Sequence, residues 1–290
     1  MKNSLSLVVC TYRGRREKAE KCLSSIYSQS VKPFEVIVIS DRKEVWIDNY
    51  PFKLFVIPEM NLCYRKNFAV SKAKGRAILF IDDDMILNKD FVKFISVFDS
   101  IEYLDAITCN IGNLGEYRKK VNLWIAFCRL FFFSTFGDGS IGLIPIGLYL
   151  HGFNNFSVTN FFSGGLSAYK KEIFDNCKFD EKLGELSPYC SGEDVEFSLQ
   201  LKNRFGYYVP MAKANHYSVG SNPGKNDVAF SQSYIVNRFY IMKKHDFIHF
   251  RNLVALMWHS LGRFISYIFF ERNPLKILGL IKGLRFIFFG

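Results

Sequence analysis

The sequence predicts an α/β protein in which a mixed, mostly parallel sheet is flanked by helices, with a basic, apolar helical region at the C-terminal end. Short apolar runs alternate with segments whose apolar residues recur at helical spacing, as in βαβ units. One run, residues 77–81, has no polar residue, which is typical of a strand covered on both faces. The 290 residues are enough for one large domain, or one and a half, with ample core.

The apolar pattern of the N-terminal part of the chain predicts alternating strands and helices. Strands are expected over residues 5–10, 34–39, 54–57, 77–81 and 105–110. The segments between them place their apolar side chains on one helical face. These helices are expected over residues 18–28, 65–74 and 90–98. No G-x-G-x-x-G separates the first strand from the first helix, which counts against a dinucleotide-binding fold.

Regular patterning fades over residues 111–160, where glycine and proline punctuate a long aromatic connection. A connection of this length predicts a lid or a binding loop. For residues 124–133 a helical excursion remains an equally open alternative. Beyond it, extended segments are expected over residues 161–169, 207–209 and 213–216. Helices are expected over residues 171–177, from the segment 191–196 to about residue 204, and over residues 228–245, 250–270 and 275–289.

The net charge of +11 is concentrated in the last 90 residues, where thirteen Lys and Arg residues accompany three acidic ones. Such a basic segment suits nucleic acid or an anionic membrane surface. Aliphatic and aromatic residues outnumber its polar spacers, which favours the membrane and argues against a nucleic-acid partner. We therefore predict attachment to an anionic membrane surface through residues 246–290. An ordinary helical subdomain that covers the sheet is the alternative.

No membrane-spanning segment is predicted, because charged residues interrupt every long apolar run. The N-terminal apolar run is too short for the core of a signal peptide and lacks a small-residue cleavage site. We therefore expect a cytoplasmic protein that attaches peripherally to the inner face of the cell membrane. Seven cysteines without a C-x-x-C pair argue against a disulfide framework and against a zinc site.

Three consecutive aspartates, Asp82, Asp83 and Asp84, follow the buried strand at once. On an extended chain Asp82 and Asp84 point to one side and Asp83 to the other. Mg²⁺ typically takes one or two carboxylates together with the phosphates of a substrate, and ligands of open α/β sheets lie beyond the carboxyl ends of the strands. The position therefore favours a metal–diphosphate site over a solvated acidic turn that caps the next helix.

A second acidic signal is the segment 191–196, which opens a helix. Ser191 and Asp194 have the spacing of a capping box, and acidic residues suit the positive end of a helix. The functional alternative is that Asp194 faces the same cleft as Asp84. His216 is a lone imidazole, for which a surface or core position is the ordinary interpretation and a metal role needs carboxylate partners.

With these signals in order, the chain from residue 5 to about residue 216 resembles the family 2 glycosyltransferases, whose fold is called GT-A. Residues 8–13 are similar to the family's opening strand and its T-Y-N turn, and residues 36–41 to its second strand. Residues 66–84 resemble the R-N…A-x-G…D-x-D run, with Lys66 in place of the Arg and Arg65 beside it. The G-G, F-D-E-x-L-G and G-E-D motifs of the acceptor side are matched by residues 163–169, 179–184 and 192–194.

The resemblance implies a role for each matching residue. Contacts to the nucleotide sugar are implied for Thr11, Tyr12, Arg13, Asp41, Arg65, Lys66, Asp82 and Asp83. Contacts to the acceptor or the sugar are implied for Gly164, Gly165 and Glu193. Asp194 would be the catalytic base, and Asp84 with His216 would hold Mn²⁺ or Mg²⁺. Arg13 stands where the family usually has Asn, and Lys66 lacks the bidentate fork of arginine.

The resemblance also implies a division of the chain. Residues 1–220 would form the GT-A domain, with a nucleotide-binding half over residues 1–110 and an acceptor-binding half over residues 111–220. Residues 221–290 would form the C-terminal helical region. The Q-x-x-R-W signature of processive synthases is missing after Asp194, so transfer of a single sugar is expected.

The predicted reaction is an inverting, metal-dependent transfer from a nucleotide-diphosphate sugar to a hydroxyl of a glycan or lipid-linked acceptor. Such a reaction would serve the synthesis of cell-envelope or surface polysaccharide or of glycoprotein. Two alternatives remain open. A sugar-phosphate nucleotidyltransferase would want a Gly-rich basic loop after the first strand, which residues 13–16 match in part. A non-catalytic membrane-surface or nucleic-acid binding module would explain the basic C-terminal region without the aspartates.

Overall fold

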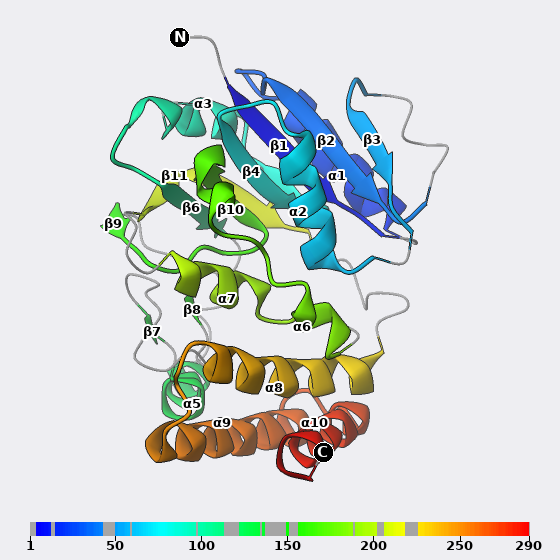
Figure 1. Ribbon diagram of the computed structural model, residues 1–290, viewed down its shortest axis with the longest axis vertical. Helices are drawn as coiled ribbons and strands as arrows, with labels where there is room; N and C mark the ends of the chain where they lie inside the picture. Colours follow the sequence, from blue (N-terminus) through cyan, green and yellow to red (C-terminus); the bar gives the residue numbers. More distant parts are fainter. Residues whose placement is uncertain are drawn as a thin grey trace.

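A layer built on the central sheet and a layer of long helices make up the molecule, and the chain ends in the helical layer (Figure 1). The strands β1 and β2 run towards the helical layer, so the carboxyl edge of that part of the sheet points to it. The computed structural model describes residues 4–12, 15–42, 50–58, 60–96, 98–112, 122–133, 135–136, 149–150, 156–187, 189–201, 206–217 and 226–289.

The sheet is mixed, and its first half is parallel, which confirms the predicted α/β class. Its parallel half consists of β1 (Leu5–Cys10), β2 (Glu35–Ser40), β3 (Lys53–Val56) and β4 (Ala77–Asp82). Antiparallel to β4 lies β10 (Leu166–Lys170), followed by β6 (Ala106–Ile111) and β11 (Gly206–His216). The short strands β5 (Met85–Leu87) and β9 (Ser157–Val158) both pair with β11. The strand order is β3-β2-β1-β4-β10-β6-β11-β5, with β9 off this path.

Helices flank the sheet largely where the periodicity predicts them. They are α1 (Arg16–Tyr27), α2 (Leu62–Lys72), α3 (Phe91–Ile95), α6 (Lys182–Glu185) and α7 (Glu193–Gln200). The helix expected from residue 65 begins at Leu62, because the Asn61 side chain accepts a hydrogen bond from the Tyr64 amide and caps it there. The helix expected over residues 90–98 is shorter, and the 3₁₀ turn η2 (Phe98–Ser100) follows it. The helix expected over residues 171–177 is instead the 3₁₀ turn η4 (Lys171–Asp175).

The later strands differ from the prediction in two ways. The strand expected from residue 161 begins only at Leu166. The two segments expected around Pro210 form one strand, β11, whose register against β6 shifts between Val209 and Lys213. Proline lacks the amide hydrogen that a sheet ladder needs, so an irregularity at this position is expected. The three residues of β5 were not predicted as a strand.

The aromatic connection contains the helix α5 (Asn122–Phe132), so the helical alternative holds for that part of it. Two short strands, β7 (Thr135–Phe136) and β8 (Tyr149–Leu150), pair with each other. The lid or binding loop predicted over residues 111–160 lies largely outside the described residues.

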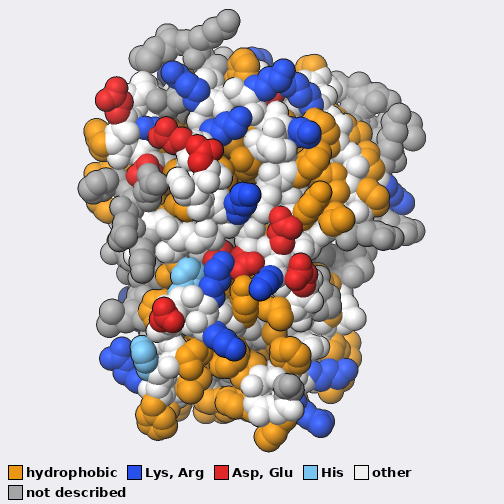
Figure 2. All heavy atoms as spheres, in the orientation of Figure 1, with side chains coloured by type: hydrophobic (Ala, Val, Ile, Leu, Met, Phe, Trp, Pro, Cys, Tyr) orange, Lys and Arg blue, Asp and Glu red, His pale blue; other side chains and the backbone are white. Residues whose placement is uncertain are grey.

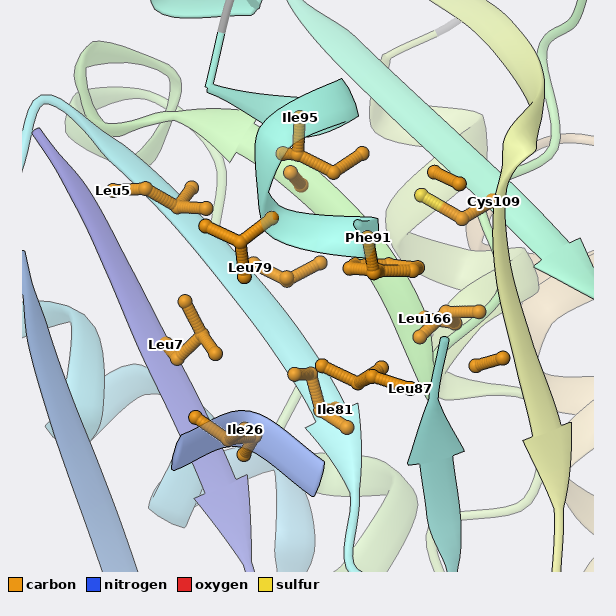
Figure 3. Packing of buried hydrophobic residues seen from close by; sticks show 14 of the residues in the cluster. Leu5, Leu7, Ile26, Leu79, Ile81, Leu87, Phe91, Ile95, Cys109 and Leu166 are labelled. Atoms are coloured by element: carbon orange, nitrogen blue, oxygen red, sulfur yellow. The ribbon is translucent and has the colours of Figure 1, made fainter. Parts of the chain in front are cut away.

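The core of the sheet layer lies on both faces of the strands, as the apolar run 77–81 predicts. Successive residues of β4 alternate between two hydrophobic clusters, with Leu79 and Ile81 in one and Ile78 and Phe80 in the other. Figure 3 shows Leu79 and Ile81 packed among side chains of β1, α1 and α3. Full burial of one such side chain contributes about 1.5–3 kcal/mol. All seven cysteines are free, and all except Cys10 are buried.

The helical layer consists of α8 (Asp227–Lys244), α9 (Phe250–Phe269) and α10 (Pro274–Phe289), as predicted. A hydrophobic cluster of its own joins these helices. Within the described parts of the chain, no helix combines the length and the apolar character that crossing a membrane requires. Polar contacts fasten α8 to the sheet layer: Asn237 Nδ2 donates to the carbonyls of Leu183, Tyr189 and Ser191.

Candidate active site

The turn of three aspartates lies at the carboxyl edge of the parallel half of the sheet. β4 ends at Asp82 and pairs there with Cys10 of β1, so the turn that follows β1 lies beside the aspartates. β2 ends alongside at Ser40, which brings Asp41 to the same edge. Ligands of open α/β sheets bind beyond this edge. Residues predicted to bind a nucleotide on three separate strands are therefore neighbours in the fold.

Asp83 and Asp84 are buried and are held by the turn that follows β1. Asp83 accepts hydrogen bonds from the Thr11 hydroxyl (2.7 Å) and from Arg15 Nε (2.8 Å). The same guanidinium donates to Asp84 Oδ2 at 2.6 Å. Burial raises the pKa of the Asp83 carboxyl, and Arg15 opposes that rise. Asp83 thus fastens the first turn to the aspartate turn.

Arg15 is a site residue that the sequence analysis did not single out. It precedes α1 and touches two of the three aspartates. Burial lowers the pKa of its guanidinium, but the hydrogen bonds and charges of Asp83 and Asp84 raise that pKa by more, so the cation is stabilised. The sequence signal for Arg15 is the basic run 13–16 after the first strand, which by itself also matches part of a nucleotidyltransferase loop.

The predicted metal ligands Asp84 and His216 lie together. β5 pairs with the end of β11 with Met85 opposite His216, and this leaves His216 Nε2 3.3 Å from Asp84 Oδ1. Lys18 Nζ lies 3.6 Å from the other oxygen of Asp84. No group of three or more His, Cys, Asp or Glu side chains that could hold a metal occurs among the residues described. Asp84 and His216 would supply two ligands. This number fits an ion such as Mg²⁺, which usually takes its remaining ligands from substrate phosphates and water.

Asp82 does not share a side with Asp84, contrary to what the alternation of an extended chain predicts, because the strand ends at Asp82 and a turn follows. Arg15 contacts Asp83 and Asp84 together, whereas Asp82 lies against the paired glycines. Its amide donates to the Gly165 carbonyl at 2.9 Å. A Cβ on Gly165 would lie 2.2 Å from Asp82 Oδ2, so only glycine fits beside this carboxyl. Burial chiefly raises the pKa of Asp82 to about 7, and Lys66 partly offsets that rise. The space beside the backbone of Gly164 and Gly165 is therefore occupied by Asp82, Glu193 and Lys66 of the same chain.

The helix α7 begins with the acidic pair Glu193 and Asp194, but without the capping box that the sequence suggests. Its N-cap is Gly192 in the left-handed conformation (φ 88°), and no side-chain hydrogen bond caps it. Asp194 Oδ1 instead accepts from the next amide, that of Val195, at 2.8 Å. Its second oxygen accepts from the Gly164 amide at 3.4 Å.

The surroundings of Asp194 favour a carboxyl that takes up protons near neutral pH. Burial raises its pKa to about 6, the charge of Glu193 adds to the rise, and Lys66 opposes it. A general base works best when its pKa lies near the working pH. Asp82 and Asp194 meet the two neighbouring glycines, Asp82 at Gly165 and Asp194 at Gly164, so the two carboxyls flank one short loop.

The neighbouring cations Arg65 and Lys66 occupy different places. Arg65 stacks on the Tyr12 ring, 4.4 Å from its centroid, and donates to the Thr11 carbonyl at 3.3 Å. Lys66 is 2 % exposed and contacts the acceptor-side loop instead. Among the residues that the structure describes, Arg65 Nε and Asp41 Oδ1 are buried polar atoms without a hydrogen-bond partner. Such atoms call for a ligand or water.

Comparison with protein families gives a match over residues 6–177 to the family described as glycosyl transferase family 2. The chain belongs to this family. A search of curated proteins finds no match. The family assignment covers the nucleotide-side strands, the three aspartates and the paired glycines, whereas Asp194 and His216 lie beyond the matched residues.

Solved structures with the same fold are glycosyltransferases, which identifies the fold of this family 2 member as GT-A. A mannosyltransferase from Pyrobaculum calidifontis in complex with GDP-Man and Mn²⁺ is 14 % identical over 97 % of this chain and 87 % of its own, with a TM-score of 0.56. GalNAc-T7 with UDP, GalNAc and Mn²⁺ is 13 % identical over 83 % and 47 %, with a TM-score of 0.54. Residues 1–349 of S. aureus TarS are 15 % identical over 97 % and 79 %, with a TM-score of 0.52.

Most predicted site residues of this family 2 glycosyltransferase lie along one edge of the fold. Arg13 lies outside the described residues. Asn67, quoted only as part of a motif, has a clear structural part: it donates to the Phe179 carbonyl at 2.9 Å and accepts from the Phe179 amide at 3.0 Å. Its amide group also donates to Glu181. Asn67 therefore joins a nucleotide-side motif to an acceptor-side motif.

Proposed function

We propose that the protein transfers one sugar from a nucleotide-diphosphate sugar to an acceptor hydroxyl in a single, inverting displacement. The observation that supports this most is the pair of carboxyls at the Gly164-Gly165 loop, with Asp82 at the nucleotide edge and Asp194 on the acceptor side. The nucleotide lies at the carboxyl edge, with its base towards Asp41 and Arg65. The donor sugar then points towards the glycine loop and Glu193.

Asp194 acts as the general base in this proposal. Its carboxylate accepts the proton of the acceptor hydroxyl while that oxygen forms a bond to the anomeric carbon, and the bond from the anomeric carbon to the diphosphate breaks. One such displacement inverts the anomeric centre. The two amides that donate to Asp194, those of Val195 and Gly164, fix its orientation.

The departing diphosphate develops negative charge, and the aspartate turn supplies the groups that meet it. Asp84 and His216 would hold Mn²⁺ or Mg²⁺, which offsets the charge of the leaving group when bound. Arg15 and Lys18 border the same carboxylate and add positive charge at this place. In the donor complex we expect Arg15 to share its hydrogen bonds between Asp83 and the phosphates.

A donor screen tests the proposed reaction. The protein is incubated with UDP-, GDP- and dTDP-sugars, a panel of glycan and lipid-linked acceptors and Mn²⁺ or Mg²⁺, and in parallel with nucleoside triphosphates and sugar phosphates. The released nucleotide or pyrophosphate is then identified. We expect metal-dependent release of a nucleoside diphosphate, with proton NMR of the glycoside product giving the inverted anomer. Release of pyrophosphate from a nucleoside triphosphate would instead support the nucleotidyltransferase. A retained anomeric configuration would contradict the single displacement.

We further propose that the outer face of the helical layer attaches to an anionic membrane, where a lipid-linked or envelope glycan acceptor would lie. Apolar side chains of α9 and α10 are exposed along this layer, among them Phe250 (84 %), Val254, Leu261, Phe264, Leu275 and Ile281. Arg251, Lys276, Lys282 and Arg285 lie on the same two helices. Figure 2 shows apolar side chains with interspersed basic ones at this end of the molecule. Exposed apolar faces with basic residues are typical of interfacial helices.

Vesicle flotation tests the membrane proposal. We expect the wild type to float with vesicles that contain phosphatidylserine, and to float less with phosphatidylcholine alone or at high salt. The double substitution Leu261→Glu and Phe264→Glu places charge on the exposed face and should abolish flotation. Tyr103→Glu, on an exposed aromatic residue of the sheet layer, is the matched control. Equal flotation of wild type and the α9 variant would exclude this face.

A further inference from the structure

Lys66 is buried between the nucleotide-side strands and the acceptor-side loop. Its Nζ lies 4.9 Å from the centroid of the Phe179 ring, and the residue is 2 % exposed. A buried ammonium is costly unless it is paired and hydrogen-bonded. Its partners are the Gly164 carbonyl at 2.9 Å and Glu193 Oε1 at 3.2 Å. These two partners and the ring hold the Lys66 ammonium at the acceptor-side loop.

The peptide groups of Gly164 connect Lys66 to Asp194. The carbonyl of Gly164 accepts from Lys66, and its amide donates to Asp194 Oδ2. A Cβ at this position would lie 2.5 Å from Glu193 Oε1 and 3.3 Å from Lys66 Nζ, so a side chain there would displace these two groups. A displacement of Lys66 would therefore move the groups that orient the proposed base.

The charged and titratable groups around Asp194 come from several elements. Glu193 precedes it on α7 and raises its pKa, whereas Lys66 on α2 lowers it. Tyr169 of β10 also lies within electrostatic reach of Asp194. Asp82 at the end of β4 interacts with both Lys66 and Glu193. Among the charged and titratable groups named here, Lys66 supplies the positive charge that favours the ionised form of Asp194.

We propose that Lys66 is a positioning residue for Asp194: it holds Gly164 and Glu193 in place and keeps the base ionised at the working pH. This inference rests on the proposed function, in which Asp194 is the base. It gives Lys66 a role different from the nucleotide contact that the family resemblance implies. In this role Lys66 contacts neither the donor nor the acceptor, so we expect its replacement to affect turnover and its pH dependence more than donor affinity.

The pH profile of turnover tests this role. Lys66→Met keeps a similar shape among Phe80 and Phe179 but removes the charge. Loss of a nearby opposite charge raises a carboxyl pKa by about one unit or more. We therefore expect the acid limb of the profile to move up by about one pH unit, with about tenfold lower turnover below pH 6, while the donor KM changes little. Lys66→Arg should restore part of the wild-type profile.

Glu193→Gln is the opposing variant. It removes the negative charge beside Asp194 and leaves Lys66 in place, so the acid limb should move to lower pH. A merely structural role for Lys66 predicts that both substitutions reduce turnover without shifting the limb in opposite directions. An acid limb that stays unchanged in Lys66→Met and in Glu193→Gln would overturn the inference. If Lys66→Met does not fold, Lys66→Gln removes the same charge while keeping a donor for the Gly164 carbonyl, and it should move the acid limb in the same direction as Lys66→Met; an unmoved limb in Lys66→Gln would equally overturn the inference.

A second measurement needs no turnover. Asp194→Asn is introduced into the wild type and into the Lys66→Met variant. The Tm of each protein, with and without Asp194→Asn, is then measured from pH 4 to pH 8. The effect of Asp194→Asn on Tm reports the titration of Asp194. It should begin near pH 4 in both backgrounds, but in the Lys66→Met background it should keep growing to higher pH and reach a larger value, because the folded-state pKa of Asp194 is higher there. Identical pH dependence in both backgrounds overturns the inference, even if the enzyme transfers sugar. A shift without any sugar transfer supports the control of Asp194 by Lys66 and removes the proposed function.

Discussion

As the proposed base, Asp194 must be ionised, but its surroundings disfavour the negative charge of the carboxylate. Its pKa in the fold is about 6, raised above the usual 3.8 chiefly by burial. A carboxyl with a raised pKa favours folding while it is protonated. That contribution is complete below about pH 4 and is lost as the pH rises through 6. At pH 7 the ionised carboxyl therefore lowers folding stability by up to ~3 kcal/mol relative to a group with the ordinary pKa.

We therefore predict that Asp194→Asn abolishes transfer and raises Tm at pH 7. The amide removes the partly buried charge and retains an oxygen that can accept from Val195. The gain in Tm should vanish towards pH 4, where the wild-type carboxyl is protonated. Turnover assays, nucleotide-dependent thermal shifts and unfolding curves across this pH range check the three parts. Asp175→Asn, on an exposed aspartate of η4, is the control and should change none of them. Full turnover in Asp194→Asn would remove the residue from the base role.

Gly165 carries a second prediction at the residue scale. A methyl group there would lie 2.2 Å from Asp82 Oδ2, so Gly165→Ala should displace the Asp82 carboxyl. We expect at least tenfold weaker binding of the nucleotide diphosphate, because a small displacement of a site residue is sufficient for a loss of that size. Isothermal titration with UDP or GDP and Mn²⁺ measures it. Ser163→Ala, two residues earlier in the same loop, should bind as the wild type does. Unchanged binding by Gly165→Ala would show that Asp82 has no part in holding the donor.

At the scale of elements, the fit between α10 and α8 depends on two glycines. A Cβ on Gly279 would lie 2.2 Å from the Val228 carbonyl oxygen, and one on Gly283 2.2 Å from Ile235 Cγ2. The Gly279 contact is with backbone, which cannot move aside as a side chain can. The small residues thus allow close packing of the two helices, as glycine does wherever backbones approach closely.

We therefore predict that Gly279→Val destabilises the helical layer. Overpacking typically costs about 1–3 kcal/mol, and backbone contact places this site at the upper end. Urea unfolding measures the loss. Ile281→Ala, on the exposed side of the same helix, is the control and should lie within about 0.5 kcal/mol of the wild type. Equal midpoints for the two variants would mean that α10 does not pack on α8 through Gly279.

At the scale of the whole molecule, α8 connects the helical layer to the loops around the site. Lys244 pairs with the buried Glu196 of α7 at 2.6 Å and with Asp180 at 2.8 Å. Asn237 binds three carbonyls near the start of α7. On the same helix, Ile235 and Val236 belong to the hydrophobic cluster that α8 forms with α9 and α10. The helical layer and the site are thus parts of one packed structure.

We accordingly expect deletion of residues 246–290 to cause unfolding or aggregation, because it uncovers the apolar face of α8. Point substitutions on the exposed face of α9 are the sounder test of membrane binding. Calorimetry of the full chain should show one unfolding transition, since buried polar contacts join the layers. Two separated transitions, with the site layer melting alone, would contradict this coupling.

The sequence by itself determined the α/β class, the positions of the main strands and helices, and the polar clusters at 82–84 and 193–194. Period-2 and period-3.6 patterns and uninterrupted apolar runs record which side chains are buried, and burial drives the local structure. The tertiary structure decided the pairings. Arg15 reaches Asp83 and Asp84, Lys66 turns to Glu193, and Asp84 meets His216 only because β5 pairs with the end of β11. These contacts join residues far apart in the chain, and no local pattern encodes a distance that the strand order sets.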